Sequence, residues 1–269
     1  MTQTPIDRIH IVESTNWKEA VIALLEPESV YEPWRCGPTE AGEGDAVAFV
    51  LNTDPASVLT EFGCVGADGD PSHAVVASAS RDPMGLVDLE TLVMMTGFRW
   101  NGDPRRHWVL DGEMAIRMSL ALEDCRYRGD QYTRYGHTPV AAARILLHSR
   151  GRCAGCSQRM DLDFDNAVDE VHVHTVDAYR RDTPVDESTV DWPGALCNRC
   201  VARMRKDGYT SLVDYRLAQH PSCPSCGAQR TQSALYGMRM NNDYAPWYRL
   251  RGCCVTYDNW TCRRCGHTW

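Results

Sequence analysis

Cysteine is the residue type in this sequence whose spacing most directly indicates chemistry. Eight of the 13 cysteines form four Cys-x-x-Cys pairs near the C-terminal end, and thiolates at this spacing are typical zinc ligands. Four thiolates satisfy tetrahedral zinc and leave no open position, so such sites are structural. We therefore predict two structural Zn2+ sites, one formed by Cys153, Cys156, Cys197 and Cys200 and the other by Cys223, Cys226, Cys262 and Cys265.

Ordinary buried thiols would explain one such pair, but not four in one region of the chain. Cys253 and Cys254 fall outside the pairs. They could be spare ligands, but we expect core residues, since free cysteine is among the most buried residue types.

A histidine pair lies between the first two cysteine pairs. His172 and His174 alternate with Val171 and Val173 in the segment 169–177. On a β-strand, both imidazoles would point to one face and both valines to the other. A histidine presented in this way could activate water or hold a metal while the valine face packs on a core. The alternative is an exposed polar strand face, but the flanking cysteine pairs favour a site.

Charge is distributed unevenly along the chain. The net charge is −8, but residues 1–150 contribute −9 and residues 151–269 contribute +1. From Pro221 to Trp269 there are six Arg and two Asp, interleaved with aromatic residues: Tyr236, Tyr244, Trp247, Tyr248, Tyr257 and Trp260. The whole-chain charge therefore does not exclude nucleic acid as a partner.

Apolar periodicity in the first half predicts a sheet or barrel with a few helices. Strands are expected where apolar residues alternate or run together between turn residues, and helices where they recur at helical spacing. The expected strands are 8–12, 45–52, 57–65 and 73–80, and the expected helices are 16–25, 86–97 and 113–124. The chain is therefore predicted to be an α+β protein.

Three domains are predicted from shifts in composition. A helix is expected to begin after Gly136, with Thr138 as its cap and Pro139 in its first turn. Beyond Gly151 the sequence is rich in Cys, His and Arg, as in small zinc-held modules. The predicted domains are 1–137, 138–218 and 219–269, the last of them a zinc ribbon.

The segment from Arg144 through Cys156, the histidine strand and the sequence Leu196-Cys-Asn-Arg-Cys resembles the HNH family of zinc-stapled ββα-metal nucleases. This resemblance implies that a strand histidine is the general base for water attacking a DNA phosphate, and that one divalent ion, Mg2+ or Mn2+, stabilises the leaving oxygen. Either His174 or His172 would be the base.

Two positions depart from the HNH pattern. The family places Asp or His directly before the base as a metal ligand, where this chain has Val171 or Val173. The family's Asn after the second cysteine pair is replaced by Val201, while Asn198 lies inside the pair. The available substitutes are Asp177, Asp191 and Asn198, so catalysis could be weak, differently ligated or lost.

The N-terminal half resembles the EVE and related PUA-superfamily domains, small β-barrels related in design to SRA domains. The similar segments are Trp34-Arg-Cys-Gly, 44–51 and 58–65. The resemblance implies a pocket with aromatic walls that reads a modified, flipped base. The candidate wall residues, each of which could instead belong to the core, are Trp34, Phe98, Trp100 and Trp108.

A modified-base reader joined to an HNH module is the architecture of type IV, modification-dependent restriction endonucleases. The partner implied is double-stranded DNA with a modified cytosine such as 5-methylcytosine. Phosphate contacts are expected from Arg126, Arg128, Arg134 and the C-terminal arginines. One HNH centre cuts one strand at a time, so double-strand cleavage would suggest a homodimer. The zinc ribbon would either stack on nucleic acid or complete the nuclease fold.

Two other classes of function stay open. The chain could be a modified-DNA-binding protein with a catalytically degenerate HNH domain, or its N-terminal half could bind RNA or protein. No apolar stretch reaches the roughly 18 residues of a membrane span, and residues 1–7 lack the pattern of a secretory signal. We therefore expect a cytoplasmic protein without a membrane partner.

Overall fold

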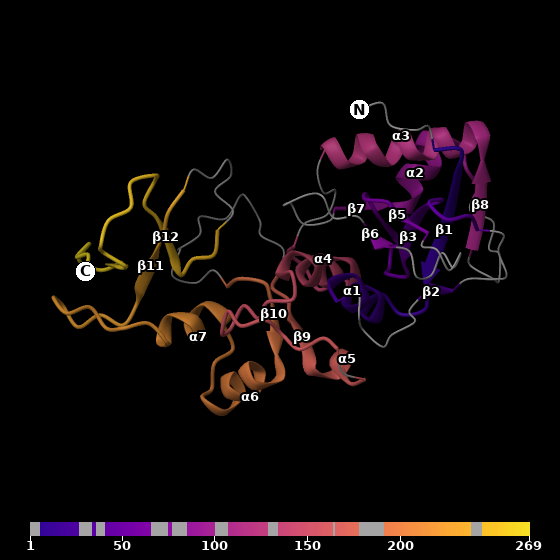
Figure 1. The fold of residues 1–269 in the computed structure, drawn as a ribbon. Coiled ribbons are helices and arrows are strands. Elements are labelled where there is room, and N and C mark those ends of the chain that lie inside the picture. The colour runs from indigo at the N-terminus through magenta and orange to yellow at the C-terminus, as the bar shows by residue number, and fades with distance from the viewer. Residues whose placement is uncertain are drawn as a thin grey trace.

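The computed structural model describes residues 6–26, 34–35, 41–65, 75–76, 85–99, 107–128, 134–163, 165–177, 191–237 and 244–269. They form a mixed α+β structure with one large sheet and two small sheets (Figure 1). No helix in these ranges is both long and apolar enough to cross a membrane.

The large sheet is centred on two parallel strands, β1 (Arg8–Ser14) and β3 (Ala46–Leu51). Its order is β2-β1-β3-β4-β7, while β8 pairs with β1, β5 with β3, and β6 with β5. The remaining strands are short: β2 (Trp34–Arg35), β4 (Ser57–Leu59), β5 (Gly63–Cys64), β6 (Val75–Val76), β7 (Leu86–Asp88) and β8 (His107–Asp111).

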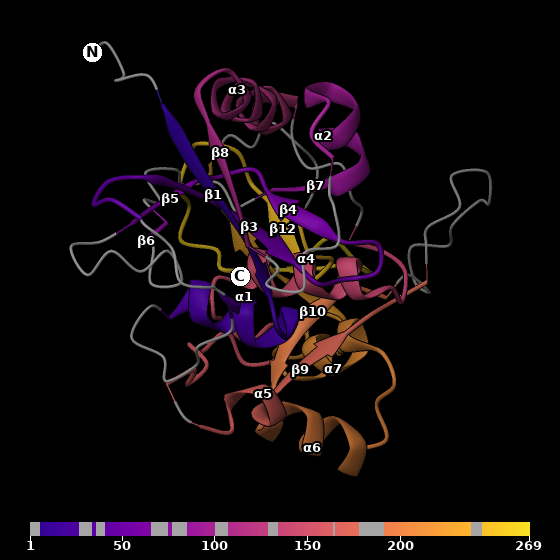
Figure 2. The same cartoon turned by 90° about the vertical axis from the view of Figure 1, so that its right-hand side faces the viewer.

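Helices cover both faces of this sheet. The helices α1 (Trp17–Leu25) and α4 (Pro139–Ser149) lie on one side, and α2 (Leu89–Thr96) and α3 (Gly112–Arg128) lie on the other (Figures 1 and 2). All six residues of β3 are buried, with Phe49 in one core and Val50 in the other. Burial on both faces explains why this strand is a continuous apolar run.

The predicted closed barrel is not found in the described residues. Their strands form an open sheet between two helical layers. A barrel would turn one face of every strand inward, whereas apolar residues of β1 and β3 alternate between two separate cores.

Local signals predicted several element boundaries. Asn16 and Thr138 cap α1 and α4, and each side chain accepts a hydrogen bond from a backbone N–H of its first turn. Two expectations need correction. The expected helix 86–97 starts with strand β7, and Asp88 caps α2. The expected strand 57–65 is divided into β4 and β5.

The second part of the chain contains two strands followed by a helix. The strands β9 (Val171–His174) and β10 (Gly194–Cys197) pair antiparallel, and α6 (Asn198–Lys206) follows β10 directly. The short helix α5 (Ala167–Glu170) precedes β9, and α7 (Leu212–Ala218) follows α6. The expected histidine strand and the helix opening at the second cysteine pair are both present.

The C-terminal part is a three-stranded sheet in the order β12-β11-β13. Its strands are β11 (Thr231–Leu235), β12 (Tyr248–Leu250) and β13 (Trp260–Cys262). Trp247 is buried in the core and lies under the guanidinium of Arg216, 5.3 Å from the ring centroid. This aromatic residue therefore docks the C-terminal sheet onto α7, while Tyr257 is fully exposed.

One hydrophobic core crosses the predicted boundaries at 137/138 and 218/219. It contains Phe49 of the large sheet, Leu146 of α4, Leu196 of β10 and Trp247. Lys18 of α1 also donates a hydrogen bond to the carbonyl of Val168 in α5. The segments are therefore packed together, so that cutting the chain after residue 137 would expose apolar surface.

We expect Leu146→Ala to lower the free energy of unfolding by about 2 to 5 kcal/mol, because it leaves a cavity in this shared core. Chemical denaturation monitored in both halves of the chain measures the effect. Leu120→Ala, at an exposed position of α3, is the matched control and should change stability by less than about 0.5 kcal/mol. Loss of stability in only the second half would contradict a shared core.

Candidate zinc and histidine sites

The first cysteine set is assembled by three local structures. Cys153 and Cys156 lie in a tight turn after α4, in which the N–H of Ser157 donates to the carbonyl of Cys153. Cys197 ends β10 and caps α6, and Cys200 lies in the first turn of that helix. The four sulfur atoms lie within 4.8 Å of one another and could hold one metal ion. The predicted set of ligands is therefore brought together.

Gly155 allows the turn to approach α6. A Cβ atom at this position would lie 2.9 Å from both Cβ and Sγ of Cys200 and 3.1 Å from the side chain of Leu196. Any other residue would push the turn away from the helix. Steric exclusion of a side chain therefore explains why glycine occupies this position.

The four thiols cannot all ionise easily without a cation. Burial raises the pKa of Cys200, and the charge of Cys153 adds to this effect. Burial also opposes ionisation of Cys156, but hydrogen bonds to its sulfur, first from the Gln158 backbone, outweigh it and lower its pKa to about 7. A divalent ion removes the conflict, since zinc binds all four groups as thiolates.

The second cysteine set has the spacing of a tetrahedral thiolate site. The sulfur atoms of Cys223 and Cys265 are 3.7 Å apart, and those of Cys226 and Cys262 are 3.6 Å apart. Zn–S bonds of about 2.3 Å in a tetrahedron place sulfur atoms about 3.8 Å apart. All four sulfurs lie within 4.8 Å, so this set could also hold zinc.

Cys253 and Cys254 are not core residues, contrary to expectation. Both are exposed, in the segment between β12 and β13. The small C-terminal sheet has little interior of its own, so cysteines in its connections do not become buried.

The histidine strand presents its two faces in part as expected. Val171 is buried in the shared core, and Val173 packs against it. A cavity of about 280 Å3 lies between β9 and α6, and Val173 lines it together with the two histidines, so the two faces are only partly separated. The side chains that matter for its chemistry are His172, His174, Arg205, Tyr209 and Thr210.

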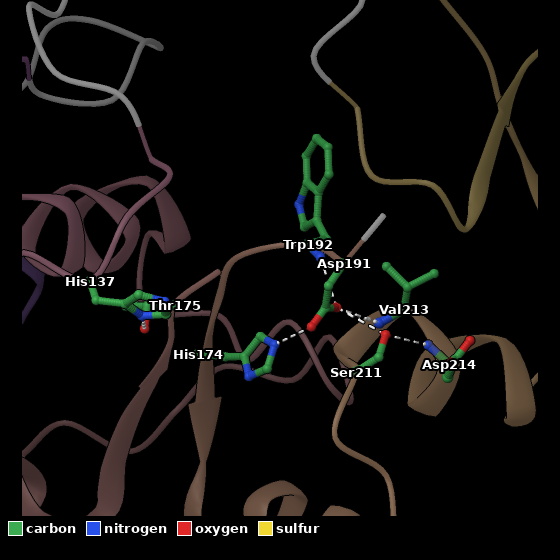
Figure 3. Close-up of polar contacts among 8 residues, drawn as sticks. All are labelled: His137, His174, Thr175, Asp191, Trp192, Ser211, Val213 and Asp214. Atoms are coloured by element: carbon green, nitrogen blue, oxygen red, sulfur yellow. Dashed lines mark hydrogen bonds and ion pairs between the residues drawn. The ribbon is translucent and has the colours of Figure 1, made fainter. Parts of the chain in front are cut away.

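His174 is held by an aspartate that precedes β10. Its Nε2 lies 2.7 Å from Oδ2 of Asp191, and both side chains are mostly buried. The other oxygen of Asp191 accepts hydrogen bonds from the Ser211 hydroxyl, the Trp192 N–H and the Val213 N–H. Figure 3 shows the imidazole, carboxylate and hydroxyl directed toward one another.

These contacts keep Asp191 ionised. Burial raises the pKa of a carboxyl group, but the hydrogen bonds from His174 and from the backbone at Trp192 and Val213 outweigh burial and lower the pKa of Asp191 below its ordinary value. Two of the donors, Ser211 and Val213, belong to the N-terminal end of α7. An ionised partner fixes the Nε2–H tautomer of His174, so that its Nδ1 can accept a proton.

His172 has a different environment from His174. Its Nε2 is buried, and no hydrogen-bond partner lies near it among the described residues. Buried polar atoms are nearly always paired.

The structure does not bring the other two substitute residues to this cavity. Asn198 lines a separate cavity of about 620 Å3, together with Val171 and Cys156. Asp177 is exposed and lies 3.1 Å from Nε2 of His137, at the end of the histidine segment. Of the three aspartate and asparagine candidates, Asp191 is therefore the one that contacts a strand histidine.

A catalytic Mg2+ or Mn2+ does not fit the described residues of the histidine cavity. These ions prefer carboxylate and other oxygen ligands, whereas the described lining offers two imidazoles and no carboxylate. Arg205 also lines the cavity, and its guanidinium stays positively charged. Within the described ranges, the groups of ligands suited to an ion are the two cysteine sets.

The candidate base-binding aromatics do not form one wall. Trp34 packs on Phe49 in the core below the sheet, with ring centroids 4.7 Å apart. Phe98 is buried in the core on the opposite face, and Trp108 packs against that second core. Trp100 lies outside the described residues.

Two of the arginines expected to contact phosphate have protein partners. Arg134 lies over the ring of Trp192, 5.0 Å from its centroid. Arg126 lies 3.8 Å from a carboxylate oxygen of Glu61. The side chain of Arg128 is outside the described residues.

A buried polar chain in the large sheet was not expected from the sequence. Nε2 of His10 lies 3.1 Å from the carboxylate of Asp45, and its Nδ1 lies 3.2 Å from Nε2 of His107. His10 is completely buried in β1. The signal that could have found it is a histidine at an inward position of an otherwise apolar strand.

Comparisons with known proteins give no relative of this chain. No protein-family model matches it, and no curated protein and no solved structure matches it significantly.

We expect purified protein to contain about two zinc ions per chain, one for each cysteine set. Cys197→Ser should lower this number to about one, because three ligands remain in the first set. Metal analysis after removal of free zinc measures it. Cys253→Ser, at an exposed cysteine outside both sets, is the matched control and should retain two. Unchanged zinc in the Cys197 variant would overturn the assignment.

We expect Asp191→Asn to lower the free energy of unfolding at pH 7. The pKa of Asp191 is lower in the folded chain, so its contribution is present above about pH 4, the ordinary aspartate value, and is lost as pH falls through the lowered pKa. Denaturation in saturating zinc should show the difference from wild type narrowing below about pH 4. Asp163→Asn, at an exposed position, should differ little at any pH.

Proposed function

We propose that the chain is an HNH-like DNA endonuclease in which His174 is the general base. The order of parts supports this assignment: a cysteine turn, the histidine strand β9, strand β10 and then helix α6 with the second cysteine pair. These parts follow one another as in the zinc-stapled ββα nucleases that the sequence resembles.

The observation that carries the proposal is the hydrogen bond between His174 and Asp191. Asp191 accepts the Nε2 proton of His174 at 2.7 Å, so Nδ1 is the nitrogen that can take a proton from water. The carboxylate also stabilises the imidazolium that forms after this transfer. The water oxygen bonds to phosphorus as its proton passes to Nδ1 of His174, the P–O bond to the sugar breaks, and the leaving sugar oxygen takes a proton from solvent.

The substrate proposed is duplex DNA that carries a modified cytosine of the 5-methylcytosine type. This part rests on the similarity of residues 34–37, 44–51 and 58–65 to EVE and PUA-like readers, and on its combination with an HNH-like module. The proposed protein is thus a type IV, modification-dependent restriction enzyme. The continuous core between the sheet and α4 supports one working unit rather than two loosely linked domains.

A modified-DNA-binding protein is the second candidate function. The observation that favours it is the absence of a carboxylate from the described lining of the histidine cavity, where Arg205 is found instead. A scaffold of this kind would keep the cysteine sets and nucleic-acid binding, while the reaction is lost.

We expect cleavage of a 5-methylcytosine duplex by the wild type, assayed with Mg2+, Mn2+ or EDTA beside an unmodified duplex and an RNA competitor. His174→Ala should lower the cleavage rate by about 10²- to 10⁴-fold, the usual effect of a general base, with binding retained. Asp191→Asn should also lower the cleavage rate, because His174 can then adopt the tautomer that carries its proton on Nδ1.

The matched control is His267→Ala, at an exposed histidine of the C-terminal sheet, which should cleave like the wild type. Cleavage by the His174 variant at the wild-type rate would exclude it as the base. Binding of the modified duplex by the wild type without cleavage under any ion condition would favour the second candidate. Preferential binding of RNA would exclude both.

A further inference from the structure

Helix α6 has three distinct faces. Cys200 and Met204 are buried, one turn apart. Val201 and Arg205, also one turn apart, line the histidine cavity, as does Met204, and Arg205 is exposed as well. The third face is exposed and consists of Arg199, Ala202, Arg203 and Lys206. These positions follow the helical repeat, so each face is continuous along the helix.

The exposed face carries positive charge that the rest of the helix does not neutralise. Among the described residues, Asp207 pairs with this face, its carboxylate 3.9 Å from Nε of Arg203. A contact of this length between exposed side chains is weak. Arg199 lies in the first turn, near the Cys156 thiol, whereas Arg203 and Lys206 lie toward the C-terminal end of the helix.

We propose that α6 binds the phosphate backbone of duplex DNA, with Arg205 holding one phosphate in the histidine cavity and Arg203 and Lys206 holding flanking phosphates. The partner class rests on the proposed function, but the surface does not require that cleavage occurs. Charge complementarity supports this occupant, because a helix with four basic residues in nine lies in a chain of net charge −8.

The cavity supplies the second, independent observation. Arg205 is exposed and lines this cavity together with His172 and His174. Its guanidinium presents paired donors that match two phosphate oxygens. The described lining of this cavity does not suit Mg2+, and the positive charge there comes from Arg205.

The cysteine set fixes this helix in place. Cys197 caps α6 and Cys200 lies one turn into it, so a zinc ion bound by both would hold the first turn against the Cys153 turn. The basic side chains then project from a fixed helix, which lowers the entropy lost on binding.

Binding of the full-length protein to a fluorescent 20-base-pair duplex, measured by anisotropy across a range of salt concentrations, tests the proposal. Each lost phosphate contact lowers the slope of log K against log salt by about 0.9. Arg203→Ala/Lys206→Ala should therefore lower the slope by about 1.8 and weaken binding on the order of ten-fold. Arg205→Ala should lower it by about 0.9 and Arg205→Lys by less, since lysine keeps the charge.

Two control variants separate this surface from a general effect of charge. Arg8→Ala/Arg117→Ala removes the same charge from exposed positions of the large sheet and α3, and should bind like the wild type. Arg203→Lys/Lys206→Arg keeps both positive charges and should bind duplex DNA like the wild type.

Wild-type binding with an unchanged salt slope in Arg203→Ala/Lys206→Ala would overturn the proposal, even if the protein cleaves DNA. Equal losses in the Arg8/Arg117 variant would overturn it as well, as would no duplex binding by the wild type. Binding through α6 without any cleavage would support it while the endonuclease proposal fails, so the two failures are distinguishable.

Discussion

The approach of the Cys153 turn to helix α6 is the constraint on which the second half of the molecule depends. Strands β9 and β10 and helix α6 are too short to bury much apolar surface alone. Four sulfur atoms within 4.8 Å join the end of α4 to the start of α6, and Gly155 leaves room for Cys200 at this junction. The histidine strand lies between these two ends, so its orientation depends on them.

The proposed role of His174 depends on the negative charge of Asp191, which is stabilised by residues outside strand β9. Asp191 is held ionised by hydrogen bonds from Ser211 and Val213, at the start of α7, and by His174. An ordered carboxylate gives the imidazole one orientation and one tautomer. In the proposed mechanism the same residue would therefore serve both stability and proton transfer.

Segments of opposite charge are packed together in this molecule. The acidic first half and the basic helix α6 belong to one molecule with a continuous core, from Phe49 to Trp247. The net charge of −8 hides a local excess of positive charge on α6, beside the histidine cavity. The N-terminal sheet contributes a second polar group, the His10–Asp45–His107 chain, whose buried position links three strands or strand ends.

The sequence by itself determined what depends on local spacing: the eight cysteines of the two sets, the alternation of His172 and His174 with valines, the caps Asn16 and Thr138, and the buried strand β3. Each of these is decided within a few residues. Tertiary structure decided what depends on contacts between distant segments. It placed Asp191 rather than Asn198 or Asp177 beside a strand histidine, put Trp34 and Phe98 on opposite faces of the sheet, opened the expected barrel into a sheet between helices, and exposed Cys253. Hydrogen-bond partners and buried faces come from packing across the whole chain, which no local pattern encodes.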